Sequence, residues 1–239
     1  GAAMKTVVIS QPMYFPWVGL LEQMRLADVF VHLDDAQFSK GGFFNRVQLK
    51  TAEGTPWLTV PLAETKLGQS LNETRMAEHD WRRKQLATLR QSYAAAPHVE
   101  EMLGLVESVF EKEHESLAAL SAASVEALAA FFEITPKEIQ WASAMGVEGT
   151  GSARVLAICE ALGAERYVTG HGAREYLVHE SFEAAGIRVE YLDYEKREYP
   201  QLHGAFTPFV SALDLAANCG GTGREVIASG TVYWKDFAR

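Results

Sequence analysis

The first third of the chain alternates between short apolar runs and polar loops. Residues 6–9 form a β-branched run that predicts a strand, and residues 17–26 predict a helix because their apolar positions recur at helical spacing. Residues 29–33 form a second strand-like run that ends at Asp34. A strand, a helix and a strand within about 30 residues predict a βαβ unit with parallel strands and a right-handed crossover.

The pattern changes after this unit. Residues 45–50 alternate polar and apolar positions, residues 51–54 predict a turn, and residues 57–62 predict a returning strand, which together indicate a β-hairpin. Residues 80–132 are rich in Ala, Leu, Glu and Lys and predict helices that are interrupted once, at Pro97.

The remaining sequence returns to alternating elements. Ser152 is predicted to cap a helix that ends at Gly163. The other predicted elements are strands at 138–142, 167–169 and 187–192 and helices at 153–162, 173–185 and 209–217. We therefore expect an α/β fold with a Rossmann-like parallel-sheet core, a β-hairpin and a helical subdomain. The whole chain, 1–239, is expected to form a single domain in which residues 80–133 are a helical insertion.

Composition narrows the classes of protein. The net charge of −9 and the pI near 5.3 argue against a general surface for duplex nucleic acid, which requires positive charge. No apolar run approaches the roughly 20 residues of a membrane helix. The two cysteines, Cys159 and Cys219, have no paired spacing, so we expect a cytoplasmic protein without a disulfide framework.

Candidate site residues follow the predicted strands, because an open parallel sheet binds ligands beyond the carboxyl ends of its strands. These candidates are Gln11, Tyr14 and Trp17 after the first strand, Asp34, Asp35, Gln37, Asn45 and Arg46 after the second, and Gly170 and His171 after a later one.

Each candidate has a structural alternative. Asp34 and Asp35 could bind Mg²⁺ or act as an acid–base pair, or they could simply turn the chain after a strand. Arg46 could clamp a phosphate or carboxylate, or form a structural ion pair. His171 is the best histidine candidate for proton transfer. The turn at 149–152 could bind an anion at a helix start, but it is neither a Rossmann fingerprint nor a P-loop.

Several motifs together resemble the WbqC-like family. The segment 11–19 fits its QPxYFPWxG pattern, 28–37 fits DxFVxxDDxQ, and 45–46 is its NR pair. The resemblance extends through the segment 154–172 and through further residues that it marks, namely Tyr176, Tyr199, Gln201, Ser211 and Asp214.

The resemblance implies an enzyme of small-molecule or amino-sugar biosynthesis that forms an amide or transfers an acyl or aminoacyl group to an amine. It implies that Arg46 and Arg154 bind an anionic group of the substrate, and that Asp34 or Asp35 removes a proton or holds Mg²⁺. The other substrate-binding residues that it implies are Gln11, Tyr14, Gln37, Tyr176, Gln201, Ser211 and Asp214.

Two further hypotheses remain open. One is an ATP-dependent ligase or nucleotidyltransferase-like enzyme, for which ATP and Mg²⁺ would be the cofactors. The other is a non-catalytic accessory protein that binds a nucleotide-sugar. All three hypotheses take a small molecule or nucleotide-sugar as partner, and all are compatible with a homodimer.

Overall fold

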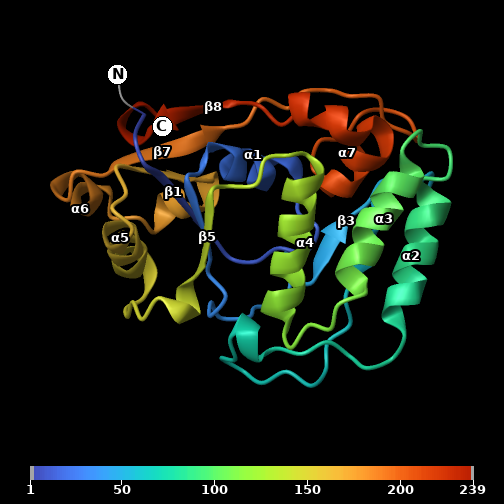
Figure 1. Ribbon diagram of the computed structural model, residues 1–239, viewed down its shortest axis with the longest axis horizontal. Helices are drawn as coiled ribbons and strands as arrows, with labels where there is room; N and C mark the ends of the chain where they lie inside the picture. Colours follow the sequence, from blue (N-terminus) through green and yellow to red (C-terminus); the bar gives the residue numbers. More distant parts are fainter. Residues whose placement is uncertain (1–2, 238–239) are drawn as a thin grey trace.

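The structure is a computed structural model that describes residues 3–237. Its centre is a six-stranded sheet in the order β5-β2-β1-β6-β7-β8 (Figure 1). These strands are β1 (Thr6–Ser10), β2 (Val29–His32), β5 (Glu138–Trp141), β6 (Arg166–Thr169), β7 (Arg188–Asp193) and β8 (Gly230–Tyr233). Every pairing is parallel except that of β8, which runs antiparallel to β7 at one edge.

The parallel strands follow the order of a doubly wound α/β sheet. When they are numbered along the chain, their order is 3-2-1-4-5, and the direction of winding reverses between β1 and β6. The connections carry α1 (Val18–Leu26), α5 (Gly151–Ala161) and α6 (His179–Ala184). The predicted Rossmann-like core is therefore confirmed.

The long connection between β2 and β5 carries the other predicted elements. It contains the antiparallel pair β3 (Arg46–Gln48) and β4 (Trp57–Thr59), then α2 (Trp81–Ser92), α3 (Val99–Phe110) and α4 (Leu117–Phe131). In Figure 1 these helices lie side by side, with α7 (Ala212–Cys219) at one end of the layer.

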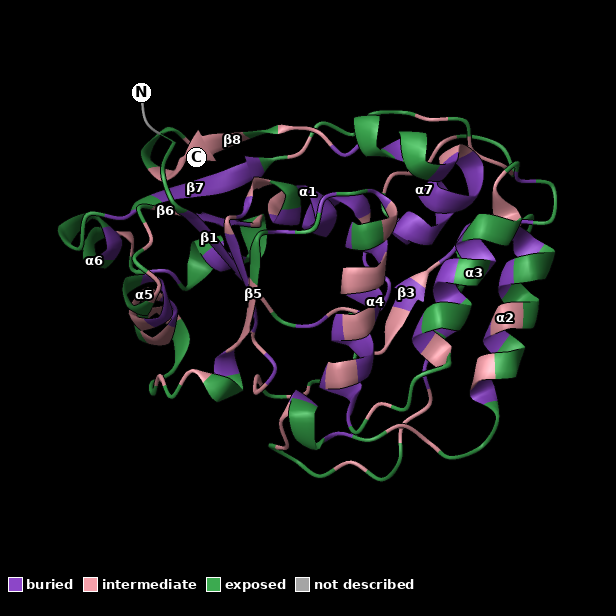
Figure 2. Ribbon diagram, in the orientation of Figure 1, coloured by how far each residue is buried: buried purple, intermediate pink, exposed green. Residues whose placement is uncertain are grey.

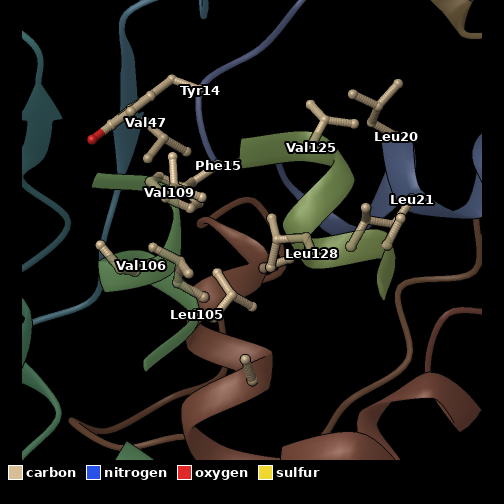
Figure 3. Close-up of a cluster of buried hydrophobic side chains, with 14 of the residues drawn as sticks. Tyr14, Phe15, Leu20, Leu21, Val47, Leu105, Val106, Val109, Val125 and Leu128 are labelled. Atoms are coloured by element: carbon tan, nitrogen blue, oxygen red, sulfur yellow. The ribbon is translucent and has the colours of Figure 1, made fainter. Parts of the chain in front are cut away.

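Alternating side chains of the strands bury two apolar cores. Val8 and Phe30 face the larger core, which includes α1, α3, α4, α7 and the hairpin. Val7 and Val29 face the smaller core, which includes α5 and α6. Both faces of the sheet are thus covered, as parallel sheets require. Figure 2 shows the buried strands, and Figure 3 shows part of the larger core, to which Phe15 and Val109 both belong.

Three local predictions are wrong for identifiable reasons. The helical region has a second break, because five charged or histidine residues at 111–115 precede Ser116, whose hydroxyl caps α4. Helix α5 begins at Gly151, and the Ser152 hydroxyl accepts a hydrogen bond from the Val178 amide in place of capping the helix. Residues 173–185 do not form one helix, because the 3₁₀ turn His171–Glu175 overlaps their start and the short helix α6 follows it.

Strand β8 has no counterpart in the predicted elements. It is four residues long, and it forms a strand through its antiparallel hydrogen bonds with β7. Among residues 3–237, no helix is both long and apolar enough to cross a membrane.

Candidate functional site

A cleft lies where the winding of the sheet reverses. It has two adjoining compartments of about 310 and 480 Å³, and both are lined by Gln11, Leu33, Val155 and Tyr176. Gln11 and Leu33 come directly after β1 and β2. Val155 lies on α5, and Tyr176 lies in the segment after β6. In an open α/β sheet this position beyond the strand ends is the expected place for a ligand.

The first compartment, here called the switch compartment, lies between the ends of β1 and β6. Besides the shared residues it is lined by Trp17, Gln23, Thr169 and Gly170. A Cβ atom on Gly170 would lie 3.2 Å from Nε2 of Gln23, so a larger residue there would push against that side chain. The Gln23 amide and the Thr169 hydroxyl give this compartment groups that donate and accept hydrogen bonds.

The second compartment, here called the helix compartment, opens at the N-terminus of α5. Its distinctive residues are Asp35, Gln37, Arg154 and the turn 149–151. Gly149 and Gly151 adopt φ values of +109° and +56°, which glycine tolerates at little cost. Thr150 is the N-cap, and its side chain makes no cap hydrogen bond. The first N–H groups of a helix have no partner within the helix, so they favour an anion.

Asp35 and Arg154 form a bidentate ion pair in this compartment. Nη1 and Nη2 of Arg154 each donate to one oxygen of Asp35 at 2.7 Å, and Nε donates to the carbonyl of Val147 at 3.1 Å. The hydrogen bond to Asp35 raises the pKa of Arg154. The side chains remain 16% and 27% exposed for Arg154 and Asp35, so a ligand can still reach the outer lone pairs of the carboxylate.

The neighbouring Asp34 has a different environment. It is buried, and its two oxygens accept hydrogen bonds from the backbone amide and the hydroxyl of Ser143 at 2.9 and 2.5 Å. These bonds tie the loop after β2 to the 3₁₀ turn after β5. Asp34 lines neither compartment, so the structure separates the two adjacent aspartates into a cleft residue and an anchoring residue.

His171 also lies outside the cleft lining. Its Nε2 is 2.7 Å from the carbonyl oxygen of Leu192, and its ring makes a T-shaped contact with the ring of Phe237. Since a carbonyl only accepts, Nε2 carries the proton in this arrangement. Its neighbour Gly170 does line the switch compartment.

The candidates around the hairpin lie elsewhere. Tyr14 is fully buried, and its hydroxyl donates to Gln85 at 2.5 Å; burial raises its pKa. Asn45 donates to the carbonyl of Val60 at 3.0 Å. Arg46 donates to the carbonyl of Gly41 at 2.8 Å and lines a separate hollow of about 270 Å³. Arg46 and Arg154 therefore do not share a pocket.

The candidates near the C-terminus form a buried anchor. Asp214 is fully buried and accepts hydrogen bonds from Tyr93, Tyr199 and Gln201 at 2.7 to 2.8 Å. Burial raises its pKa, although the hydrogen bonds from Tyr199, Tyr93 and Gln201 act in the opposite direction. Ser211 caps α7 and donates to the carbonyl of Phe15 at 2.7 Å. This network fixes the segment before α7.

The structure thus brings seven of the candidates named above into one cleft: Gln11, Trp17, Asp35, Gln37, Arg154, Gly170 and Tyr176. Gln23 was missed by the sequence analysis. It follows Leu20 by three residues on α1, and both line the switch compartment, so a polar residue at that helical spacing was the available signal.

Neither a metal cluster nor a reactive cysteine is found among the residues that the structure describes. Within the described part of the chain, no cluster of three or more His, Cys, Asp or Glu side chains could hold a metal ion. Cys159 is buried, which raises its pKa to about 12, so at neutral pH it is a thiol and not the nucleophilic thiolate.

Comparisons with known proteins give a consistent result. Residues 11–226 match the sequence model of the WbqC-like protein family. The chain is also 32% identical over 220 residues to the uncharacterized protein Rv1507c of Mycobacterium tuberculosis, which covers 91% of this chain and 95% of that protein. No solved structure matches this chain.

Proposed function

The chain belongs to the WbqC-like protein family, and we propose that it is an enzyme that forms an amide or transfers an acyl or aminoacyl group to a small amine such as an amino sugar. One observation carries this proposal. Gln11 and Asp35 line a single cleft at the reversal point of the sheet together with Arg154, which lies more than 100 residues further along the chain. A scaffold role alone would not need them to share a solvent-filled space.

Substrate binding follows from the chemistry of the two compartments. The helix compartment suits an anionic group, because the first amides of α5 have no partner within the helix and favour negative charge. The guanidinium of Arg154 already pairs with Asp35, so its proposed role is to hold that carboxylate in the compartment. The outer lone pairs of Asp35 can accept hydrogen bonds from an amine or from sugar hydroxyls. A nucleotide-linked amino sugar offers both kinds of group.

The proposed reaction is a direct transfer. The amine nitrogen attacks the carbonyl carbon of an activated acyl donor, the new C–N bond replaces the bond to the leaving group, and Asp35 accepts the proton that the amine loses. Gln11, Gln23 and Tyr176 line the cleft, and in this proposal their side-chain amides and hydroxyl donate hydrogen bonds to the oxyanion that develops. The protonated thiol of Cys159 does not favour a covalent acyl-enzyme.

Product formation tests the proposal directly. Amino sugars and their nucleotide-linked forms are incubated with acyl thioesters, or with carboxylates and ATP, and products are detected by mass spectrometry. An amide product is expected with the native chain and should be lost in Arg154→Met. Arg90→Met removes an exposed arginine that also pairs with a carboxylate, Glu100, and should retain activity.

A ligase or nucleotidyltransferase reaction is the second candidate. The 3-2-1-4-5 order of the parallel strands and the glycine turn before α5 favour a nucleotide in the cleft. Release of pyrophosphate that requires ATP and a carboxylate would select this reaction over transfer from a thioester. Ligand-induced stabilisation without any product would instead indicate a binding protein and contradict both enzymatic proposals.

A further inference from the structure

A third cavity, here called the aromatic pocket, adjoins the switch compartment. It has a volume of about 340 Å³ and is lined by Met13, Tyr14, Pro16, Trp17, Phe43, Val47, Gln48 and Phe209. Met13 and Trp17 also line the switch compartment, so the two spaces share a wall. The volume lies at the lower end of the roughly 300–1,000 Å³ that small-molecule pockets occupy.

The lining of the aromatic pocket is largely apolar. The ring centroids of Trp17 and Phe209 lie 5.7 Å apart. Tyr14 is buried and its hydroxyl is already used by Gln85, and the amide of Gln48 donates to Thr55. Because the hydroxyl of Tyr14 and the side-chain nitrogen of Gln48 already have partners and the rest of the lining is largely apolar, an apolar ligand fits this pocket better than a polar one.

Two large apolar side chains are held at this pocket while partly exposed. Phe43 and Phe209 are 49% and 53% exposed. Hydrogen bonds fix the backbone near both rings. The backbone amide of Tyr14 donates to the carbonyl of Phe43 at 2.9 Å. Two residues before Phe209, the amide and the carbonyl of Thr207 both bond to the side chain of Gln201. Covering these rings with apolar ligand atoms would remove exposed apolar surface from water.

One cation lies at the same place. Nζ of Lys196 is 4.7 Å from the centre of the Phe209 ring. An ammonium group beside an apolar pocket favours a ligand with a hydrocarbon part and a negatively charged end.

We propose that the aromatic pocket receives the hydrocarbon part of the acyl donor, so that the donor is an apolar carboxylic acid or its activated derivative. The shared wall of Met13 and Trp17 would then place the carboxyl carbon next to the switch compartment. The inference rests on the proposed function for the fate of that carbon, whereas occupancy of the pocket can be measured without turnover.

Binding of straight-chain carboxylates from butyrate to decanoate, and of benzoate, tests the inference by calorimetry. We expect Kd to fall roughly fourfold for each added methylene until the pocket is full, and then to stop falling. Tight binding of benzoate with weak binding of every aliphatic acid would identify an aryl group as the occupant. No binding by any member, or an affinity that does not depend on the length of the chain, would overturn the inference.

A pair of variants locates the binding. Phe209→Asp places a carboxylate in the lining and should weaken the best carboxylate at least tenfold. Leu67→Asp makes the same change at a fully exposed residue outside the lining and should leave Kd unchanged. Equal effects in both variants would overturn the inference.

The outcomes also separate this inference from the proposed function. Saturable carboxylate binding that Phe209→Asp abolishes, without any amide product, would support the pocket and contradict the reaction. Amide formation whose rate is the same for acetyl and longer acyl donors would support the reaction and contradict the pocket.

Discussion

The guanidinium of Arg154 meets the carboxylate of Asp35 as a two-pronged ion pair with both N–O distances at 2.7 Å. The partners are 119 residues apart and join the loop after β2 to the first turn of α5. Since both line the helix compartment, a single contact sets the position of the cleft's carboxylate relative to the helix N-terminus.

Asp35→Asn should abolish amide formation with little loss of stability. The pair is partly exposed, and such pairs contribute about 1 kcal/mol or less to folding, which corresponds to a fall in Tm of up to about 4 °C. Product yield and calorimetric Tm are the measurements. Glu100→Gln breaks the exposed pair with Arg90 and serves as the control. Full activity in Asp35→Asn would remove this carboxylate from the mechanism.

Asp214→Ala should destabilise the fold strongly. The change leaves the hydroxyls of Tyr93 and Tyr199 and the amide of Gln201 without their buried acceptor, at a cost of about 3–5 kcal/mol. The free energy of unfolding from urea titration measures the loss. Asp193→Ala, which removes an exposed carboxylate, should stay within about 0.5 kcal/mol. A similar small effect in both variants would contradict the anchoring role.

His179 should make the fold less stable in weak acid. Burial lowers its pKa below the ordinary 6.5, so the unfolded chain binds a proton more readily than the folded chain. Its contribution to stability is therefore complete above pH 6.5 and is lost as the pH falls below that value. His179→Gln should flatten the decline of Tm between pH 7 and 5.5, whereas the exposed His79→Gln should leave its slope intact.

Gly19→Ala and Gly104→Ala should have opposite effects, although both glycines lie within helices. A Cβ atom on Gly19 would lie 2.2 Å from the Trp17 ring, so the indole must move, at a cost of about 1–3 kcal/mol. A Cβ atom on Gly104 meets nothing within 4 Å, and the better helix former should add about 0.5–1 kcal/mol. Urea titration compares them, and equal shifts would contradict the assigned packing of Trp17.

The displaced indole gives Gly19→Ala a second consequence. Trp17 forms part of the wall between the switch compartment and the aromatic pocket. The variant should therefore weaken carboxylate binding even under conditions where the protein is fully folded, and calorimetric titration at 15 °C measures the change. Unchanged Kd would show that the indole position is immaterial to the pocket.

The sequence by itself determined the elements whose signal is local. The β-branched run 6–9 and the apolar run 29–33 became β1 and β2, and Gly163 ends its helix with φ +67°, because strand preference and the left-handed freedom of glycine depend on neighbouring residues alone. The same logic placed Gln11 and Asp35 beyond strand ends and hence at the cleft.

Only the tertiary structure decided the partners. Asp34 and Asp35 are adjacent in sequence, yet they bond to different partners. Asp34 accepts hydrogen bonds from Ser143, 109 residues away, and Asp35 pairs with Arg154, 119 residues away. Asp214 carries the same carboxylate, but the hydroxyls of Tyr93 and Tyr199 enclose it in the core. The chemistry of a carboxyl group is fixed by its residue type, whereas its access to solvent depends on which distant segments pack around it.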